Sequence, residues 1–219
     1  MPPPGSISAA RPASPTGPTG MRGAWRVSQI SVAWALFAAS AATLLGLATH
    51  SPLVATFGAI GIVDGLGSAA LTRHFGHGLR HGRLSSIHER RAHTIVTLGL
   101  VIVGTGAVAV GTPHFLHGET SEPSPVTVVL ALASLGVLVE LARRKRVLAR
   151  RVGSAALHAD SHMSAVGAAQ SAVTVVGAGA ALLDIAWADP LGAMVVGAGA
   201  VTVGVHSAHG RRRSRPADA

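Results

Sequence analysis

The chain has 219 residues, of which 48% are hydrophobic and only 12% are charged, with a net charge of +9 and no cysteine. Soluble domains carry about 25% charged residues, so this composition lacks the polar surface that a soluble fold requires. The absence of cysteine excludes disulfides and thiolate metal sites. The absence of tyrosine and the scarcity of phenylalanine leave little for base stacking, so we expect no nucleic-acid partner.

Six apolar runs alternate with polar connectors along the chain. A helix that crosses a bilayer needs about 20 mostly apolar residues, and the six runs approach this length. We therefore expect an all-α bundle of six transmembrane helices, with spans at about 30–48, 53–71, 94–111, 126–141, 155–183 and 190–205.

The two ends of the chain differ from the spans in composition. The Pro-, Ser- and Gly-rich residues 1–27 are expected to form a disordered tail, because they cannot bury a core. The membrane domain is expected to cover 28–209, and a basic tail to cover 210–219. The sequence leaves open whether translation starts at Met1 or at Met21.

The basic residues are sorted by segment. All 18 Lys and Arg residues fall in the first, third, fifth and seventh polar segments, and none falls in the second, fourth or sixth. Short loops that hold the basic residues stay in the cytoplasm. The pattern predicts a multi-pass protein of the plasma (inner) membrane, with both termini in the cytoplasm and the lipid bilayer as a partner.

One carboxylate, Asp64, lies inside the second span. An ionisable group at membrane depth is costly, and it usually faces a polar cavity or a partner. Asp64 is therefore either a cation ligand or proton carrier, which we favour, or a structural group that bonds a neighbouring helix.

The start of the fifth span holds the richest set of polar side chains. His158 and His162 are four residues apart and share one face of a helix, whereas Asp160 between them points elsewhere. Two imidazoles and a carboxylate from another helix could bind Zn(II) or a similar ion. The expected metal ligands are thus Asp64, His162 and His158. The alternative is that His158 and Asp160 only lie at the membrane interface.

The basic connector after the second span is rich in histidine and contains His74, His77, His81, His88 and His93. These side chains form either a low-affinity metal-collecting loop on the cytoplasmic side or a solvated basic loop that titrates near neutral pH. No phosphate loop, nucleophile elbow or dinucleotide motif is present in the sequence, so we expect neither an enzyme nor a permanently bound cofactor.

Several of these segments resemble the membrane domain of the cation diffusion facilitator (cation efflux) family. The resemblance covers about residues 31–205, and it rests on Asp64, on FGHG or HGRL in the connector, on SAALHADSHMSAVGAAQSAVTVVG and on WADPLGAMVVGA. It implies six spans with both termini inside and the transport of a divalent cation. The chain resembles a short form, because it ends soon after the sixth span without the family's C-terminal cytoplasmic domain.

The chain departs from the family pattern at three of the four positions where the resemblance places ligands. The Asp-x-x-x-Asp pair of the second span falls on Ile60 and Asp64, and the His-x-x-x-Asp motif of the fifth span falls on Met163 and Gly167. His162 is one residue out of register, which is about 100° around a helix. The ordinary four-ligand zinc site is therefore in doubt.

Two functions are compatible with these features. The first is a divergent antiporter that exports a zinc-like divalent cation from the cytoplasm in exchange for protons. The second is a transport-inactive six-helix relative that binds a partner or serves as a structural subunit. A homodimer is compatible with either. Asp64 and His162 facing one another across the second and fifth spans would favour the first.

Overall fold

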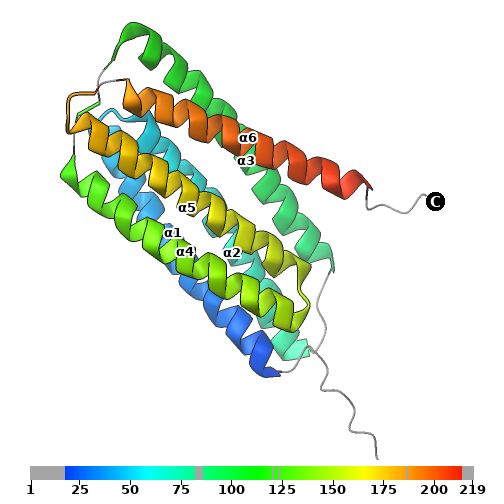
Figure 1. Cartoon of the computed structure of the whole chain (residues 1–219). Helices are drawn as coiled ribbons and strands as arrows, with labels where there is room; N and C mark the ends of the chain where they lie inside the picture. The colour runs from blue at the N-terminus through cyan, green and yellow to red at the C-terminus, as the bar shows by residue number, and fades with distance from the viewer. Residues whose placement is uncertain (1–17, 82–85, 120, 123, 186, 214–219) are drawn as a thin grey trace, which may run out of the picture.

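The computed structural model describes residues 18–81, 86–119, 121–122, 124–185 and 187–213. This part of the chain contains six helices and no strand, which confirms the expected all-α fold (Figure 1). The helices are α1 (Pro18–Ala48), α2 (Pro52–His81), α3 (Ser86–His117), α4 (Pro125–Val152), α5 (Ala155–Ala181) and α6 (Ala188–Arg213). Each of them contains a stretch long and apolar enough to cross a membrane.

Several helices extend further at their Arg-rich ends than the apolar runs predicted. α1 begins at Pro18, so residues 18–27 of the expected disordered tail are helical. The reason is tertiary packing, because Ala24 and Val27 are buried in one cluster with Val152 at the end of α4. α2 and α4 also continue through their basic segments, since arginine is a good helix former. Polarity ends a membrane span but does not end a helix.

The six helices form two groups. α1, α2, α4 and α5 lie together, and α3 and α6 pair along one side of them (Figure 1). Within the larger group, α1 packs chiefly on α2 and α4 on α5, while α3 and α6 contact the group mainly through α2 and α5. Consecutive helices alternate in direction, so the Arg-rich ends lie on the same side of the bundle. We call this side the basic end.

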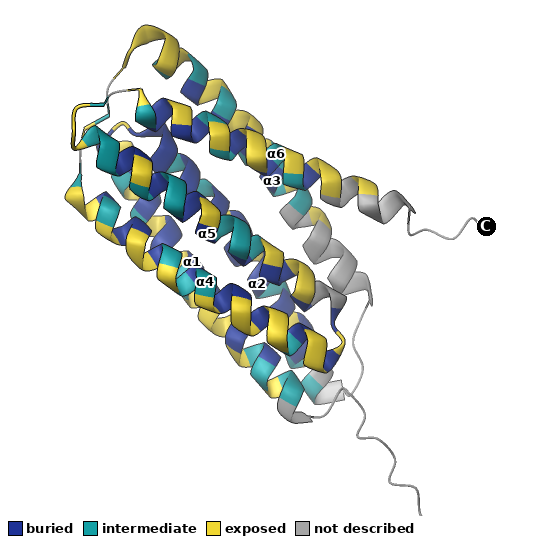
Figure 2. Ribbon diagram, in the orientation of Figure 1, coloured by how far each residue is buried: buried dark blue, intermediate teal, exposed yellow. Residues whose placement is uncertain are grey.

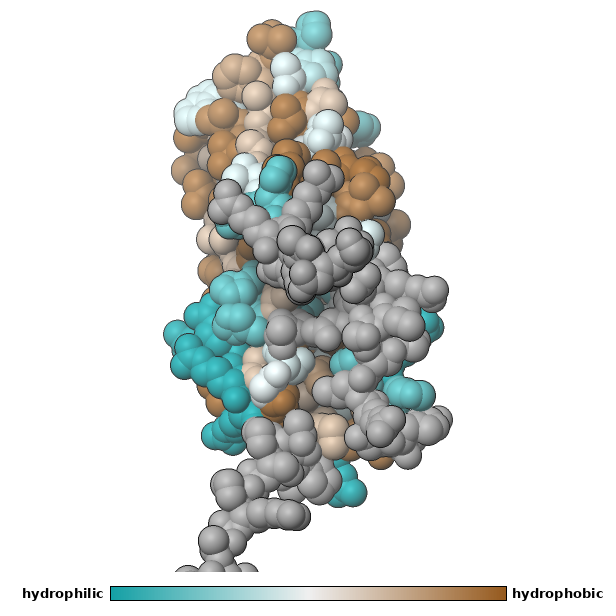
Figure 3. Space-filling view, turned by 90° about the vertical axis from the view of Figure 1, so that its right-hand side faces the viewer, coloured by the Kyte–Doolittle hydropathy of each residue, from teal (hydrophilic) through white to brown (hydrophobic). Residues whose placement is uncertain are grey.

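The outer faces of the helices are apolar and the interior is partly polar. Figure 2 shows the exposed residues on the outside of the bundle, and Figure 3 shows hydrophobic side chains over much of one face, with hydrophilic ones gathered toward one end. Exposed apolar side chains include Leu36, Phe37, Leu44, Ile102, Val129 and Val176. So large an apolar surface marks contact with lipid, and the chain is a multi-pass integral membrane protein.

The interface between α3 and α6 depends on two glycines. A Cβ atom added to Gly104 would lie 2.6 Å from the carbonyl oxygen of Gly197, and one added to Gly197 would lie 2.6 Å from that of Gly104. Such a distance leaves no room for a methyl group. Small residues allow this close backbone contact between helices in lipid, where no hydrophobic effect drives them together.

Candidate functional site

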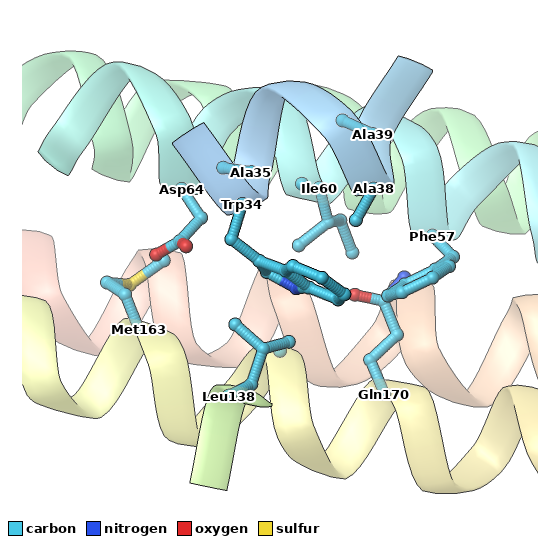
Figure 4. Close-up of a pocket in the computed structure, with 12 residues that line it drawn as sticks. Trp34, Ala35, Ala38, Ala39, Phe57, Ile60, Asp64, Leu138, Met163 and Gln170 are labelled. Atoms are coloured by element: carbon cyan, nitrogen blue, oxygen red, sulfur yellow. The ribbon is translucent and has the colours of Figure 1, made fainter. Parts of the chain in front are cut away.

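A small cavity lies between α1, α2, α4 and α5, near the middle of the span that α2 forms (Figure 4). Its volume is ≈ 20 Å³, which is room for about one water molecule or one small ion. The residues that matter for its chemistry are Trp34, Ile60, Asp64, Met163, Gly167 and Gln170.

The polar side chains of this cavity lack partners within the described part of the chain. Asp64 is buried, and its Oδ1 atom accepts no hydrogen bond there. Three more atoms are buried there without a hydrogen-bond partner, namely the amide nitrogen and oxygen of Gln170 and the indole nitrogen of Trp34. Figure 4 shows the Asp64 carboxylate pointing from α2 toward Met163 on α5, with the Trp34 indole between it and the Gln170 amide. Buried unpaired polar groups require an explanation, such as a water molecule or an ion.

The cavity brings together all four positions at which the resemblance placed ligands. Ile60 and Asp64 are one turn apart on α2, Met163 and Gly167 are one turn apart on α5, and all of them line it. Only Asp64 contributes an oxygen ligand. At Gly167 a Cβ atom would lie 3.2 Å from a methyl group of Leu138, so Leu138 occupies the space next to this glycine. The positions of the family site are retained, whereas most of its ligand atoms are not.

The two histidines predicted to complete the metal site lie elsewhere. His158 and His162 share one face of α5 as expected, with their Nε2 atoms 3.3 Å apart, but both are exposed and neither lines the cavity. The described residues contain no group of three or more His, Asp or Glu side chains that could hold a metal ion. The structure thus does not bring Asp64 and His162 together in this state, and the ligand role of both histidines stays a prediction.

The connector histidines were expected in a loop, but the described ones lie on a helix. His74 belongs to α2 and is buried, with its ring 5.4 Å from that of Phe75 in an edge-on arrangement. His77 lies on the same helix and is exposed. The side chains of His81 and His88 lie outside the described residues, so a metal-collecting role for this segment remains a prediction.

The most unusual group in the interior is an ammonium from the basic segment that follows the fourth apolar run. Lys145 is the single lysine of the chain, and its side chain is completely buried. Its Nζ atom lies 2.7 Å from Oδ2 of Asp160 and donates hydrogen bonds to the hydroxyls of Ser31 (2.7 Å), Ser164 (2.8 Å) and Ser68 (3.2 Å). We call these five residues the Lys145 cluster. It joins α1, α2, α4 and α5 at one point.

A signal for the burial of this lysine was present in the sequence. The buried residues of α4 include Leu138, Leu141, Lys145, Ala149 and Val152, which recur at helical spacing. The arginines on either side of Lys145 are exposed instead. The apolar periodicity of α4 therefore continues through the basic segment and places its one lysine on the inner face.

A tight turn sets α5 against α4 and so places Asp160 opposite Lys145. Gly153 ends α4 in the left-handed conformation, with φ 65°, which glycine adopts without a steric penalty. Ser154 then begins α5, and its hydroxyl accepts a hydrogen bond from the backbone nitrogen of Leu157. Asp160 is buried within the bundle, whereas His158 beside it is exposed.

The Lys145 cluster lies next to the cavity, toward the basic end. On α2, Ser68 is one turn beyond Asp64, and on α5, Asp160 is one turn before Met163. The cavity and the cluster are thus two parts of one polar interior.

Comparison with known proteins agrees with this architecture. The cation efflux transmembrane domain matches residues 81–209, which is more than half of the chain and extends from α3 to α6. No curated protein matches the sequence. The chain belongs to the cation efflux family of membrane transporters.

Proposed function

We propose that the protein carries a cation across the membrane by exposing the Asp64 cavity to the two sides in turn. One observation carries this proposal: a buried carboxylate with an unpaired oxygen lines a cavity of ≈ 20 Å³ near the middle of the apolar span of α2. An ionised group at that depth is costly without a partner, and a bound cation would supply one. Gln170 offers a second oxygen ligand in the same cavity.

The charge pattern indicates the orientation of the protein, and the proton gradient then sets the direction of transport. We place the protein in the inner (plasma) membrane, with its basic end and both termini in the cytoplasm as the positive-inside rule indicates. A carboxylate must lose its proton before it binds a metal ion, so cation binding releases a proton. An inward proton gradient would then drive the cation outward in exchange for protons.

A zinc-like divalent cargo is one form of this proposal. It would require more ligands than the cavity offers in this state. His162 would enter the cavity only if α5 turned by about 100°, and His158 would follow on the same face. A transport assay with several ions decides this point.

The proposal is tested with the full chain in liposomes, by measuring the flux of Zn²⁺, Mn²⁺, Na⁺ and K⁺ against a pH gradient. Asp64→Asn keeps the shape of the side chain and removes its charge, so we expect it to abolish the flux. Glu140→Gln is the matched control, because Glu140 is an exposed carboxylate that pairs with Arg144 on the same helix at 2.6 Å. An unchanged flux in Asp64→Asn would remove Asp64 from the mechanism.

A transport-inactive relative is the second candidate, because Ile60, Met163 and Gly167 bring no oxygen or nitrogen ligand to the cavity. The same assay separates the two. If the wild-type chain neither binds nor moves any cation of the panel, the structural or partner-binding function replaces the transport function.

A further inference from the structure

The charges around the cavity do not balance. Asp64 and Asp160 are two buried carboxylates, and Lys145 is one buried ammonium. Lys145 pairs directly with Asp160, whereas Asp64 has an unpaired oxygen that faces the cavity. With all three groups ionised, these side chains together carry one excess negative charge. In a medium of low dielectric constant, an uncompensated charge costs several kcal/mol or more.

We infer that Lys145 is a resident cation of the site and that it restricts the transported ion to a single positive charge, as in an alkali-metal ion. This inference rests on the proposed transport function and specifies its substrate class. One monovalent ion beside Asp64 makes the interior neutral. A divalent ion would leave one excess positive charge buried in the bundle.

An incoming ion cannot easily displace the Lys145 ammonium. Its ammonium contacts oxygen atoms from three other helices, at Ser31, Ser68, Asp160 and Ser164. To leave, it would have to give up an ion pair and three hydrogen bonds in the interior of the bundle. The positive charge is therefore a fixed property of this protein's site.

The ligand atoms of the cavity agree with a hard monovalent ion. The oxygen ligands are the Asp64 carboxylate and the Gln170 carbonyl oxygen, and the one sulfur in the lining is the uncharged thioether of Met163, with no imidazole or thiolate beside it. Oxygen ligands favour hard cations, whereas nitrogen and sulfur ligands favour zinc and copper. The cavity has room for about one water molecule, so an ion must enter largely dehydrated. A small divalent ion such as Mg²⁺ gives up its water reluctantly.

An exchange of one monovalent ion for one proton is electroneutral. One monovalent ion that leaves Asp64 is replaced by one proton on the same carboxylate. Each cycle then moves equal charge in both directions. We expect the flux to follow the pH gradient and to be unaffected when a potassium–valinomycin clamp changes the membrane voltage.

The decisive experiment compares ion binding by three forms of the full chain at constant ionic strength. Lys145→Met leaves both carboxylates and raises the excess to two negative charges. Lys145→Met combined with Asp160→Asn removes both partners and restores one negative charge. Thermal unfolding in detergent reports binding, because a ligand of the folded state raises Tm. Na⁺, Li⁺, Mn²⁺ and Zn²⁺ are the probes, with choline as the inert cation.

We expect Na⁺ or Li⁺ to raise the Tm of the wild-type chain more than Mn²⁺ or Zn²⁺ does. Lys145→Met should bind Mn²⁺ at least tenfold more tightly than the wild type, whereas the double variant should not. The double variant keeps the test valid if Lys145→Met alone does not fold, because it leaves no unpaired partner of the ion pair and should retain the wild-type preference for monovalent ions.

Three outcomes would overturn the inference. If the wild type binds and transports Mn²⁺ or Zn²⁺ through Asp64, the transport function stands and the limit on charge is wrong. If both Lys145 variants gain Mn²⁺ binding equally, the lysine acts by its volume and not by its charge. If no ion binds to any of the three forms, the transport function itself fails.

Discussion

The α3–α6 pair and the four-helix group are held together in different ways. α3 and α6 meet through backbone contact at Gly104 and Gly197, whereas the four helices meet at the buried ammonium of Lys145. Both kinds of contact hold helices together in lipid, where the hydrophobic effect does not drive their association. Close packing of small residues leaves nothing for an ion to bind. Polar contacts cost desolvation energy, but they concentrate charge where a cation can be held.

The difference explains where the candidate site lies. The cavity, Asp64 and the Lys145 cluster all belong to the four-helix group. The α3–α6 pair contacts this group through an apolar cluster that includes Ile60, Val63, Leu100 and Ala200. We therefore expect mutations in the pair to change stability and mutations in the group to change both stability and ion binding.

The largest effect is expected when one partner of the buried ion pair is removed. Asp160→Asn removes the carboxylate that pairs directly with the Lys145 ammonium, which should lower the free energy of unfolding by about 3–5 kcal/mol. Addition of Lys145→Met should recover most of this loss, because replacing both partners by uncharged groups is often nearly neutral. Denaturant titration in detergent measures both variants. If Asp160→Asn is as stable as the wild type, the pair is not buried in the membrane-embedded protein.

A smaller effect is expected in the α3–α6 pair. Gly197→Ala forces a methyl group against the backbone of Gly104 and should cost about 1–3 kcal/mol, with ion binding unchanged. Gly199→Ala is the control, since a Cβ atom there would meet nothing within 4 Å. It should change stability by no more than about 0.5 kcal/mol. Equal unfolding temperatures for the two variants would contradict the close approach of α3 and α6.

Gln170→Leu should separate stability from function within the four-helix group. The substitution removes a buried amide that lacks partners in the described structure, so it should raise the free energy of unfolding by about 1 kcal/mol. It should also weaken cation binding, because one oxygen ligand is lost. A variant that is less stable than the wild type would show that the amide already has a partner in the absence of added ion.

The smallest effect is expected at the surface of the group. Glu140→Gln breaks the exposed pair with Arg144 and should cost no more than about 0.5 kcal/mol. The difference in the free energy of unfolding between this variant and the wild type should vanish in high salt, because salt screens exposed charges. A larger loss of stability that does not depend on salt would mean that this end of α4 is not in water. Unfolding at two salt concentrations checks this.

The sequence led to the residues that line the cavity but not to the lysine next to it. Asp64 was recognised because a carboxylate stands out in an apolar run, and the resemblance placed Ile60, Met163 and Gly167 beside it, where the cavity is found. The burial of Lys145 was not predicted, because its neighbours in the sequence are exposed arginines. The spacing of the apolar residues on α4 is consistent with an inward-facing Lys145, but only the contacts with α1, α2 and α5 show that the inner face of α4 extends as far as this residue.

The six helices and the sidedness of the cations follow from the sequence by itself, because hydropathy over about 20 residues and the position of each arginine are local properties. The tertiary structure alone decided which side of each helix turns inward. It exposed His158 and His162, buried Asp160 between them, and brought it to the one lysine of the chain. Neighbouring residues on a helix point about 100° apart. A small rotation of the helix therefore decides which of them is buried, and only packing against the neighbouring helices fixes that rotation.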